Sequence, residues 1–276
     1  MTIKLVTDEK IAETSSKGNQ EKWRDGGRWY KLDQFGYEGL AETMVSRLLE
    51  YSNVESDMPF RFVRYRMERV NAHRRDRTGC SSADFLKPGE SIVTLAHLFR
   101  RMDLSLMEKL KRLPSDKQRI EYLALKTAEL TGLDRFPQYL TMLFEVDGLF
   151  LNDDRHLNNI AVLEKDGCFD YCPIFDNGAG LLSNTQTAQM DIEPKALIRT
   201  VKASPFQTTF NRQIIHVRKL FGSQLRIPQF TEEELLRELT EPLSYYAERD
   251  RSIIAERVCQ TILIRQKENL CHLYAA

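Results

Sequence analysis

Two short polar stretches in the middle of the chain decide its fold. The first is Leu151-Asn152-Asp153-Asp154-Arg155-His156-Leu157-Asn158-Asn159, and the second is Phe175-Asp176-Asn177-Gly178. Together they supply an aspartate, an asparagine five positions later and an isolated Asp-x-Gly. Phosphoryl transfer uses such a set, because one carboxylate orients the attacking hydroxyl while an amide oxygen and a second carboxylate hold magnesium on the nucleotide phosphates. The spacing therefore predicts an ATP-dependent phosphotransferase.

The sequence between these stretches predicts a β-hairpin. Residues 160–163 and 169–175 are strand-like, and Asp166-Gly167 provides a tight turn between them. The returning strand brings the chain back to its start, so we expect Asp176 to lie beside Asn159. Magnesium accepts carboxylate and amide oxygens while it keeps waters and phosphates at its other positions. Asn159 and Asp176 are therefore candidate magnesium ligands.

Asp154 is the candidate catalytic residue of the loop. Its carboxylate could accept or orient the proton of a substrate hydroxyl. His156 lies two positions away, where an imidazole could act as a general base or, as we favour, orient the loop. Either stretch alone would be an ordinary polar turn, because Asp, Asn and Gly dominate turns. Their combination with a predicted apolar helix at Phe136–Phe150 and with the hairpin favours a functional site.

The N-terminal third supplies the cation that a phosphate site needs. Asp25-Gly26-Gly27 predicts a tight hairpin turn, and Lys31 lies in the strand after it. Apolar residues at helical spacing predict a helix from about Tyr37 to Tyr51. Glu42, at the edge of the apolar stripe, could pair with Lys31 and hold it over the phosphates. Glu38, one turn earlier, is the alternative partner.

The predicted elements define an α+β, bilobal protein kinase-like fold. Strands dominate the first third, including residues 60–67, and helices dominate the rest. We expect a small β-rich N-lobe at residues 1–75 and a larger helical C-lobe at residues 76–276, joined near residues 68–90, with the adenine-contacting hinge near Tyr65 to Val70. The expected C-lobe helices include Ile92–Phe99, Leu104–Leu113, Asp116–Leu130, Phe136–Phe150 and about Ser252 to Tyr274.

Two polar regions have no clear periodicity. The region from Ser183 to about Pro205 is rich in Thr and Gln, which indicates a mobile loop. A basic cluster around His73 is best interpreted as a solvated loop near the connection between the lobes. It comprises Arg69, His73, Arg74, Arg75 and Arg77. The candidate phosphorylation sites in or near the mobile loop are Thr185, Thr187, Thr200, Ser204, Thr208 and Thr209.

Composition argues against several classes of protein. The chain has 276 residues with 40 Lys+Arg and 40 Asp+Glu, so its formal net charge is zero. A general binder of nucleic acids or membrane surfaces normally carries a basic surplus, so we expect neither partner. We find no apolar run of membrane-spanning length, no signal-peptide core and no zinc-ligand spacing among the five cysteines. We expect a cytoplasmic protein with reduced thiols, and secretion or delivery to a host cell stays an open alternative.

The segment before the first hairpin is small and polar. Its backbone amides could fold over phosphates, although it lacks the repeated glycines of other nucleotide loops. Ser15-x-x-Gly18-Asn19-Gln20-Glu21-Lys22 resembles the phosphate loop of the HipA-like serine/threonine kinases, which has a Ser-x-x-Gly-Ala-Gln-x-Lys pattern. Asn152-x-Asp154-x-His156-x-x-Asn159, together with Asp176, resembles the catalytic and metal-binding motifs of the same family.

This resemblance implies a bilobal kinase fold that uses ATP and magnesium. Asp154 would be the catalytic aspartate, with Asn159 and Asp176 as magnesium ligands. Lys31 would be the nucleotide lysine, and Ser15 matches the serine that these kinases phosphorylate on themselves to switch off. We expect the chain to lack the extra N-terminal subdomain of HipA, so the resemblance implies neither a DNA-bound partner protein nor a toxin role. The other candidate nucleotide-binding residues are Gly18, Gln20, Lys22 and Glu42.

We predict transfer of the ATP γ-phosphate to a serine or threonine hydroxyl of a protein substrate, including the chain itself. The identity of that substrate and of any regulatory partner protein stays open. Asp154-Arg155-His156 also resembles the catalytic loop of phosphoinositide kinases, which would imply a lipid or small-molecule kinase. A third hypothesis is a nucleotide-binding interaction module without catalysis, which the complete set of Asp154, Asn159 and Asp176 disfavours.

Overall fold

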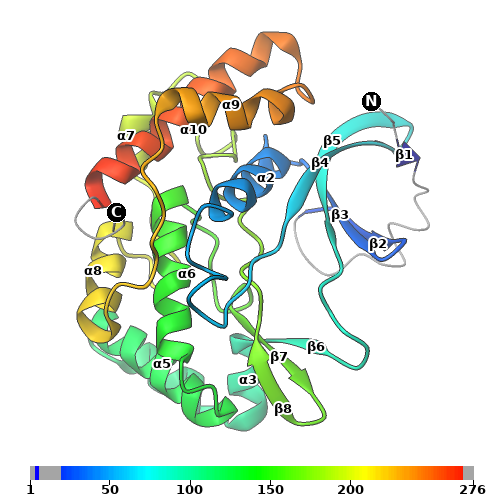
Figure 1. The fold of residues 1–276 in the computed structure, drawn as a ribbon. Helices are drawn as coiled ribbons and strands as arrows, with labels where there is room; N and C mark the ends of the chain where they lie inside the picture. Colours follow the sequence, from blue (N-terminus) through cyan, green and yellow to red (C-terminus); the bar gives the residue numbers. More distant parts are fainter. Residues whose placement is uncertain (1–3, 6–19, 270–276) are drawn as a thin grey trace.

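A twisted sheet forms the smaller part of the molecule, and helices form most of the larger part (Figure 1). The computed structural model describes residues 4–5 and 20–269. Within these residues the sheet has the strand order β1-β4-β5-β3-β2, and all its neighbours are antiparallel except β1 and β4. The five strands are β1 (Lys4–Leu5), β2 (Lys22–Asp25), β3 (Arg28–Leu32), β4 (Tyr65–Ala72) and β5 (Arg75–Ala83).

The hairpin predicted around Asp25-Gly26-Gly27 is confirmed by β2 and β3. Gly26 and Gly27 have φ values of 55° and 73°, which a tight turn between twisted strands requires and which glycine adopts without strain. The register places Lys22 directly opposite Lys31. Because opposite residues of an antiparallel pair share one face of the sheet, the two lysines project to the same side.

Helix α2 (Glu38–Leu49) packs closely against the sheet, on β4 and β5. A Cβ atom added to Gly39 would lie 2.7 Å from the carbonyl carbon of Gly79, so the helix and β5 touch through their backbones. A Cβ atom added to Gly79 would lie 2.0 Å from the carbonyl oxygen of Lys31 in β3. This close packing puts Glu42, one turn after Gly39, next to the strand that carries Lys31.

Gly79→Ala is expected to destabilise the sheet. The added methyl group would meet backbone atoms of β3, which cannot move aside as a flexible side chain can. Overpacking of this kind costs about 2 kcal/mol of unfolding free energy, which urea denaturation followed by the fluorescence of Trp23 and Trp29 would measure. Ser82→Ala, in the same strand, is the matched control and should cost less than about 1 kcal/mol. Equal stability of Gly79→Ala and the parent protein would contradict the close packing.

Helix α6 (Phe136–Phe150) is the centre of the larger part of the molecule. All its residues except Gln138 are buried, because α5, α8 and α10 pack around it. Among the described residues, none of the helices combines the length and apolar composition needed to cross a membrane. The helices of this part besides α6 are α3 (Leu95–Met102), α4 (Ser105–Arg112), α5 (Asp116–Thr131), α7 (Pro194–Ile198), α8 (Phe210–Phe221), α9 (Glu232–Leu243) and α10 (Glu248–Asn269).

A second sheet lies beside these helices, with the strand order β6-β7-β8. Its strands are β6 (Ser91–Thr94), β7 (Ala161–Lys165) and β8 (Cys168–Tyr171). The helix predicted at Ile92–Phe99 is therefore wrong at its start, since the first two apolar residues belong to β6 and α3 begins at Leu95. Apolar residues at the end of a strand and the start of a helix produce one continuous run, which hides the boundary.

The strands next to the predicted site are shorter than expected. The strand predicted at residues 169–175 ends at Tyr171, because Pro173 has no N–H group to donate to a neighbour. Beyond it Ile174 pairs with Phe62 in an isolated bridge. This bridge accounts for the first half of the strand expected at residues 60–67, of which only the second half belongs to β4.

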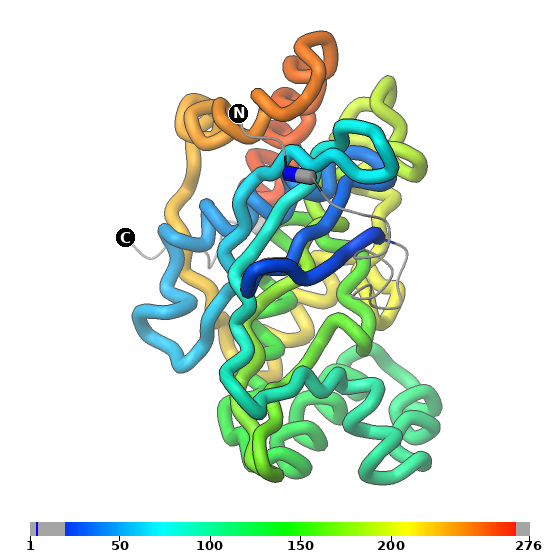
Figure 2. Tube along the Cα trace, turned by 90° about the vertical axis from the view of Figure 1, so that its right-hand side faces the viewer, coloured from blue at the N-terminus to red at the C-terminus, as the bar shows by residue number. Residues whose placement is uncertain are grey.

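The sequence does not predict β5, because its residues are almost all polar and show no apolar alternation. The basic cluster is not a loop between the lobes, since His73 and Arg74 form the turn of the β4–β5 hairpin. The sheet therefore continues past residue 75, where we expected the N-lobe to end. The chain passes from this sheet to β6 through residues 84–90, whereas Tyr65 to Val70, expected near the hinge, lies within β4 (Figure 2).

The polar region from Ser183 to Pro205 contains α7 and packs against the helices. Leu197 and Ala203 are buried in a cluster with Phe210 of α8. Arg257 of α10 donates hydrogen bonds to main-chain carbonyls of the region, including that of Gln189 at 3.0 Å. The few apolar anchors are too widely spaced to form a periodic pattern, which explains why the sequence predicts only a mobile loop here.

Candidate active site

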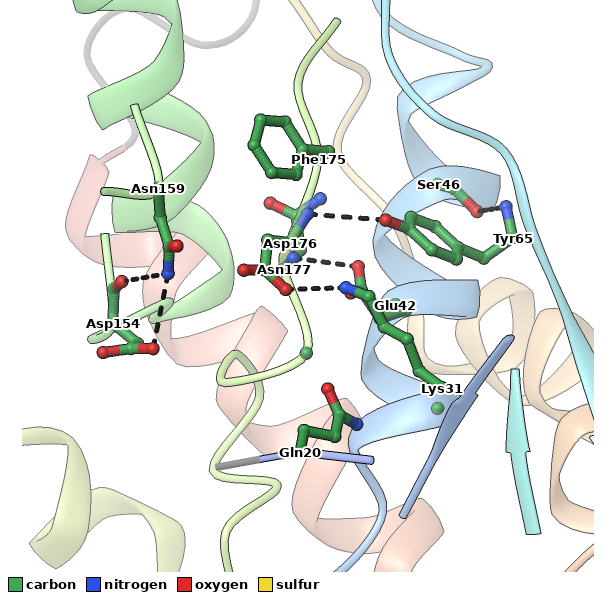
Figure 3. A network of polar contacts seen from close by, with 12 residues as sticks. Gln20, Lys31, Glu42, Ser46, Tyr65, Asp154, Asn159, Phe175, Asp176 and Asn177 are labelled. Carbon is green, nitrogen blue, oxygen red and sulfur yellow. Dashed lines mark hydrogen bonds and ion pairs between the residues drawn. The ribbon is translucent and has the colours of Figure 1, made fainter. Parts of the chain in front are cut away.

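A buried cluster of one lysine and two carboxylates joins the two parts of the molecule (Figure 3). Lys31 Nζ lies 2.5 Å from Oε1 of Glu42 and 2.6 Å from Oδ1 of Asp176. The side chain of Lys31 is 12% exposed and that of Glu42 is 1% exposed. Strand β3, helix α2 and the segment after β8 therefore meet at one ammonium group. The predicted pairing of Lys31 with Glu42 is confirmed.

Both carboxylates of this cluster have further supports. Oε2 of Glu42 accepts a hydrogen bond of 2.8 Å from the Asn177 amide, so α2 contacts the Asp-x-Gly segment directly. Tyr65 lies on the other side of the lysine, with its ring centre 5.3 Å from Lys31 Nζ, within the range of a cation–π contact. The main-chain amide of Asp176 faces the Tyr65 hydroxyl at 3.5 Å. These contacts hold the segment next to the lysine.

The charges of the cluster shift its pKa values in opposite directions. Burial alone would lower the pKa of Lys31, but Asp176 and Glu42 raise it well above its ordinary value. Burial alone would raise the pKa of Asp176, but Lys31 outweighs this effect and lowers the pKa to about 2. Burial raises the pKa of Glu42, and Lys31 opposes that rise. Lys31 and Asp176 are therefore charged partners at neutral pH.

Glu38, the alternative partner of Lys31, has a different role. Its carboxylate accepts hydrogen bonds from the amides of Phe35, at 2.7 Å, and Gly36, at 3.1 Å. These bonds satisfy amides of the loop that precedes α2. Glu38 therefore supports the start of the helix that carries Glu42.

Asp33 links the strand of Lys31 to the helix of Glu42. Its Oδ1 accepts a hydrogen bond of 2.6 Å from the Gly39 amide, and its Oδ2 accepts one of 2.6 Å from the Tyr246 hydroxyl. Burial raises the pKa of Asp33 to about 7, although the bond from Tyr246 acts in the opposite direction. The sequence does not reveal this link, because Tyr246 is 213 residues further along the chain.

The stability of the parent protein relative to Asp33→Asn should fall as the pH rises through about 7. The pKa of Asp33 in the folded protein lies above its ordinary value of 3.8, so folding favours the protonated carboxyl. The contribution of Asp33 to stability is fully present below its ordinary pKa of 3.8 and is lost as the pH rises through its pKa in the folded protein, about 7. Urea denaturation of both proteins between about pH 5 and pH 8.5 measures the difference. A difference that does not change with pH would contradict the raised pKa.

The loop that contains Asp154 lies on the other side of Asp176 from Lys31 (Figure 3). The amide nitrogen of Asn159 donates to the main-chain oxygen of Asp154 at 2.9 Å. His156 Nε2 is 3.7 Å from Oδ1 of Asp154, and the Asp154 side chain is 59% exposed. Partial desolvation raises the pKa of Asp154, while His156 opposes this rise and Asp176 adds to it. Asp154 thus presents an accessible carboxylate beside the cluster.

A buried arginine fixes this loop relative to the segment of Asp176. Nη1 of Arg155 donates to the main-chain oxygens of Asn159, at 3.1 Å, and Phe175, at 2.6 Å. The same guanidinium pairs with Asp147 of α6 at 3.0 Å, and both side chains are 1% exposed. One nitrogen atom therefore holds the main chain of Asn159 and that of Phe175, the residue before Asp176. The main chains at the two predicted magnesium ligands are thus held close together.

Asp147 and Arg155 are supports of the site that the motif alone does not reveal. Asn152 is a third support. Its side-chain nitrogen donates to Oδ1 of Asp147 and to the main-chain oxygen of Asp176, both at 3.1 Å. One signal could have identified Asp147, which is an ionisable residue within an otherwise largely apolar and buried helix. Such a residue almost always has a partner, since an unpaired buried charge is costly.

Arg155→Met should destabilise the protein and misplace the loop. Removing one partner of a buried ion pair leaves an uncompensated charge on Asp147, which costs about 3 kcal/mol or more of unfolding free energy. Urea denaturation measures this loss. Arg199→Met, at an exposed position after α7, is the matched control and should change stability by less than about 0.5 kcal/mol. Similar stabilities of the two variants would show that Arg155 does not hold the site together.

Part of the predicted phosphate loop lies within the described chain. Gln20 donates to the main-chain oxygen of Leu32 at 2.9 Å, which ties the start of β2 to the end of β3. The side chain of Lys22 makes no hydrogen bond or ion pair with any residue that the structure describes. Burial lowers the pKa of Lys22, while the carboxylates of the cluster oppose this effect. Ser15 and Gly18 lie outside the described residues.

The oxygen atoms of the two predicted ligands suit magnesium. Lys31 donates a hydrogen bond to Oδ1 of Asp176. Among residues 4–5 and 20–269, no hydrogen bond reaches Oδ2 of Asp176. The side-chain nitrogen of Asn159 donates a hydrogen bond to Asp154, which leaves the side-chain oxygen of Asn159 available as a ligand. One carboxylate and one amide oxygen are a typical protein share of a magnesium site that also holds waters and phosphates. No group of three His, Cys, Asp or Glu in the described chain could hold a metal ion.

A lysine–glutamate pair on a small sheet lobe, facing an Asp/Asn loop and an Asp-x-Gly segment on a helical lobe, is the arrangement of the protein kinase-like fold. The chain is similar to the crystal structure of the Helicobacter pylori proinflammatory kinase CtkA, with a TM-score of 0.57 and 12% sequence identity. The match covers 92% of this chain and 89% of that chain. The predicted α+β, bilobal protein kinase-like fold is therefore confirmed.

A weaker similarity is to the complex of the Shewanella oneidensis toxin–antitoxin proteins HipA and HipB with operator DNA. Its TM-score is 0.48 at 12% identity, and it covers 95% of this chain and 67% of that chain. No protein-family model and no curated protein matches the chain. At 12% identity the similarity to CtkA establishes the fold alone, and the roles of individual residues depend on the geometry of the site.

Proposed function

We propose that the chain is an ATP- and magnesium-dependent kinase that phosphorylates serine or threonine hydroxyls of proteins, including its own. The observation that carries the proposal is the contact of Lys31 with both Glu42 and Asp176, next to the exposed carboxylate of Asp154. A purely structural ion pair would not need a third ionisable group left open to solvent. The kinase fold supports the same function.

Each residue of the site has a distinct task in the proposed reaction. Lys31, aligned by Glu42, would contact the phosphate oxygens of ATP. Asp154 would hold the acceptor hydroxyl and receive its proton as the oxygen bonds to the γ-phosphorus. The bond between that phosphorus and the bridging oxygen breaks, and ADP leaves. The raised pKa of Asp154 suits a group that must accept a proton.

Asp176 and Asn159 would hold the metal. Magnesium, when bound there, would neutralise negative charge on the phosphates and on the leaving ADP. Lys31 lowers the pKa of Asp176, so Asp176 would present a negative charge to the ion at neutral pH. Lys22, which projects to the same side of the sheet as Lys31, adds a second cation for the phosphates.

Asp154→Asn and Asp176→Asn should each reduce phosphate transfer by about a hundredfold or more, because each removes a charge that acts in the reaction. The measurement is incorporation of label from γ-labelled ATP with magnesium, into the chain itself and into a mixed protein acceptor. Asp153→Asn is the matched control, since it makes the same change one residue away from Asp154. It should retain most of the activity.

The acceptor is tested in the same assay. Phosphoamino-acid analysis of the labelled product should find phosphoserine or phosphothreonine. Label that passes to phosphoinositides and not to protein would instead identify a lipid kinase. Labelling by Asp154→Asn and Asp176→Asn as strong as that of the parent would contradict the assigned site. ATP binding without transfer to any acceptor would identify a non-catalytic module.

A further inference from the structure

The linker between α9 and α10 contacts Asp33, a residue that supports the proposed site. Tyr246, in this linker, donates a hydrogen bond of 2.6 Å to Oδ2 of Asp33, whose Oδ1 binds the Gly39 amide. Asp33 lies two residues after Lys31 in sequence, and Gly39 lies three residues before Glu42. A single carboxylate therefore joins the strand of the lysine to the first turn of the helix of its partner, and Tyr246 fixes that carboxylate from outside.

The position of Tyr246 is itself well determined. The main-chain oxygen of the preceding residue, Tyr245, accepts hydrogen bonds from Arg69, at 2.6 Å, and from Thr78, at 3.0 Å. The main-chain oxygen of Tyr246 accepts one of 3.0 Å from Arg251 of α10. The linker is thus attached to β4, β5 and α10 at once. Burial, together with Asp33, keeps the pKa of the Tyr246 hydroxyl well above its ordinary value, so it remains a donor.

The same C-terminal region also holds the other end of α2. Arg47 donates a hydrogen bond of 2.8 Å to the main-chain oxygen of Glu238 in α9 and pairs with the carboxylate of Glu241. Tyr51, just after α2, donates 2.9 Å to the side chain of Glu238. Helix α9 packs along α2, as the adjacent blue and orange helices in Figure 1 show. Helix α2 is therefore held at both ends by residues 238–246.

We propose that Tyr246 is a positioning residue for the proposed kinase reaction, through which the C-terminal helices set the alignment of Glu42 with Lys31. The inference rests on the proposed function, since it concerns the same lysine–glutamate pair. Tyr246 touches neither member of the pair. It acts through Asp33, whose orientation decides where the first turn of α2 begins.

The physical reason is that the two carboxylate oxygens of Asp33 have different hydrogen-bond donors. With the hydroxyl of Tyr246 in place, Oδ2 is satisfied and Oδ1 stays directed at the Gly39 amide. Without the hydroxyl, a carboxylate that has lost a hydrogen bond in a buried site gains by rotating toward water or another donor. The Gly39 amide then loses its acceptor, and the first turn of α2 loosens. Glu42, one turn further along, moves relative to Lys31.

Tyr246→Phe tests this role, because it removes only the hydroxyl. Tyr122→Phe in α5 is the control, since the Tyr122 hydroxyl has no hydrogen-bond partner among the described residues. Two measurements are compared with the parent protein. The first is hydrogen exchange of the α2 amides without nucleotide, and the second is the steady-state rate of phosphate transfer from ATP with magnesium.

We expect faster exchange in α2 and a fall in kcat of about tenfold for Tyr246→Phe, with an unchanged KM for the protein acceptor. Tyr122→Phe should match the parent in both measurements. Unchanged exchange in α2 of Tyr246→Phe would overturn the proposal, and so would exchange that rises equally throughout the protein. If Tyr246→Phe does not fold, Asp33→Ala supplies the same test, because it removes the acceptor of both hydrogen bonds.

The two measurements separate this proposal from the function on which it rests. A parent protein that transfers no phosphate would contradict the proposed function, and exchange in α2 would still decide whether Tyr246 positions the helix. A parent protein that is active, with a Tyr246→Phe variant that is equally active, would contradict the positioning role and leave the kinase assignment intact.

Discussion

The buried contact of Lys31 with Glu42 and Asp176 is the interaction on which the site depends. A lysine removed from water is costly unless carboxylates compensate its charge. Here the two carboxylates come from a helix of the small lobe and from a segment of the helical lobe. The requirement for charge compensation therefore brings together parts of the chain that are 145 residues apart. The ion cluster is at once a constraint on the fold and the candidate site for phosphate.

Each carboxylate of the cluster depends on a different scaffold. The segment of Asp176 is held by Arg155 and Asn152, which are anchored on Asp147 in the most buried helix. Glu42 depends on the close contact of α2 with β5 and on the support of the C-terminal helices. The two scaffolds meet at Lys31, and the Asn177 amide also donates directly to Glu42. The lysine–carboxylate cluster therefore depends on packing in both parts of the molecule.

The sequence predicts the parts of the site that depend on local spacing. Asp154, Asn159 and Asp176 belong to two short motifs joined by a hairpin, so their proximity follows from a tight turn at Asp166-Gly167. The pairing of Lys31 with Glu42 follows from a strand next to an amphipathic helix. Contacts between distant segments are beyond such reasoning. The bond from Tyr246 to Asp33 and the polar strand β5 both depend on tertiary packing that leaves no periodic pattern, and Arg155 looks like an ordinary loop arginine until its burial is known.

We propose that Lys31 and Asp176 contribute to a nucleotide site in which magnesium, when bound, would neutralise negative charge on the phosphates. Calorimetric titration of the chain with ATP, in magnesium and then in a chelator, tests this claim most directly. We expect much tighter binding of ATP with magnesium for the parent protein. Asp176→Asn should lose this gain and keep weak binding of ATP alone. ATP affinity that is the same with magnesium and with chelator, or no binding of ATP at all, would contradict it.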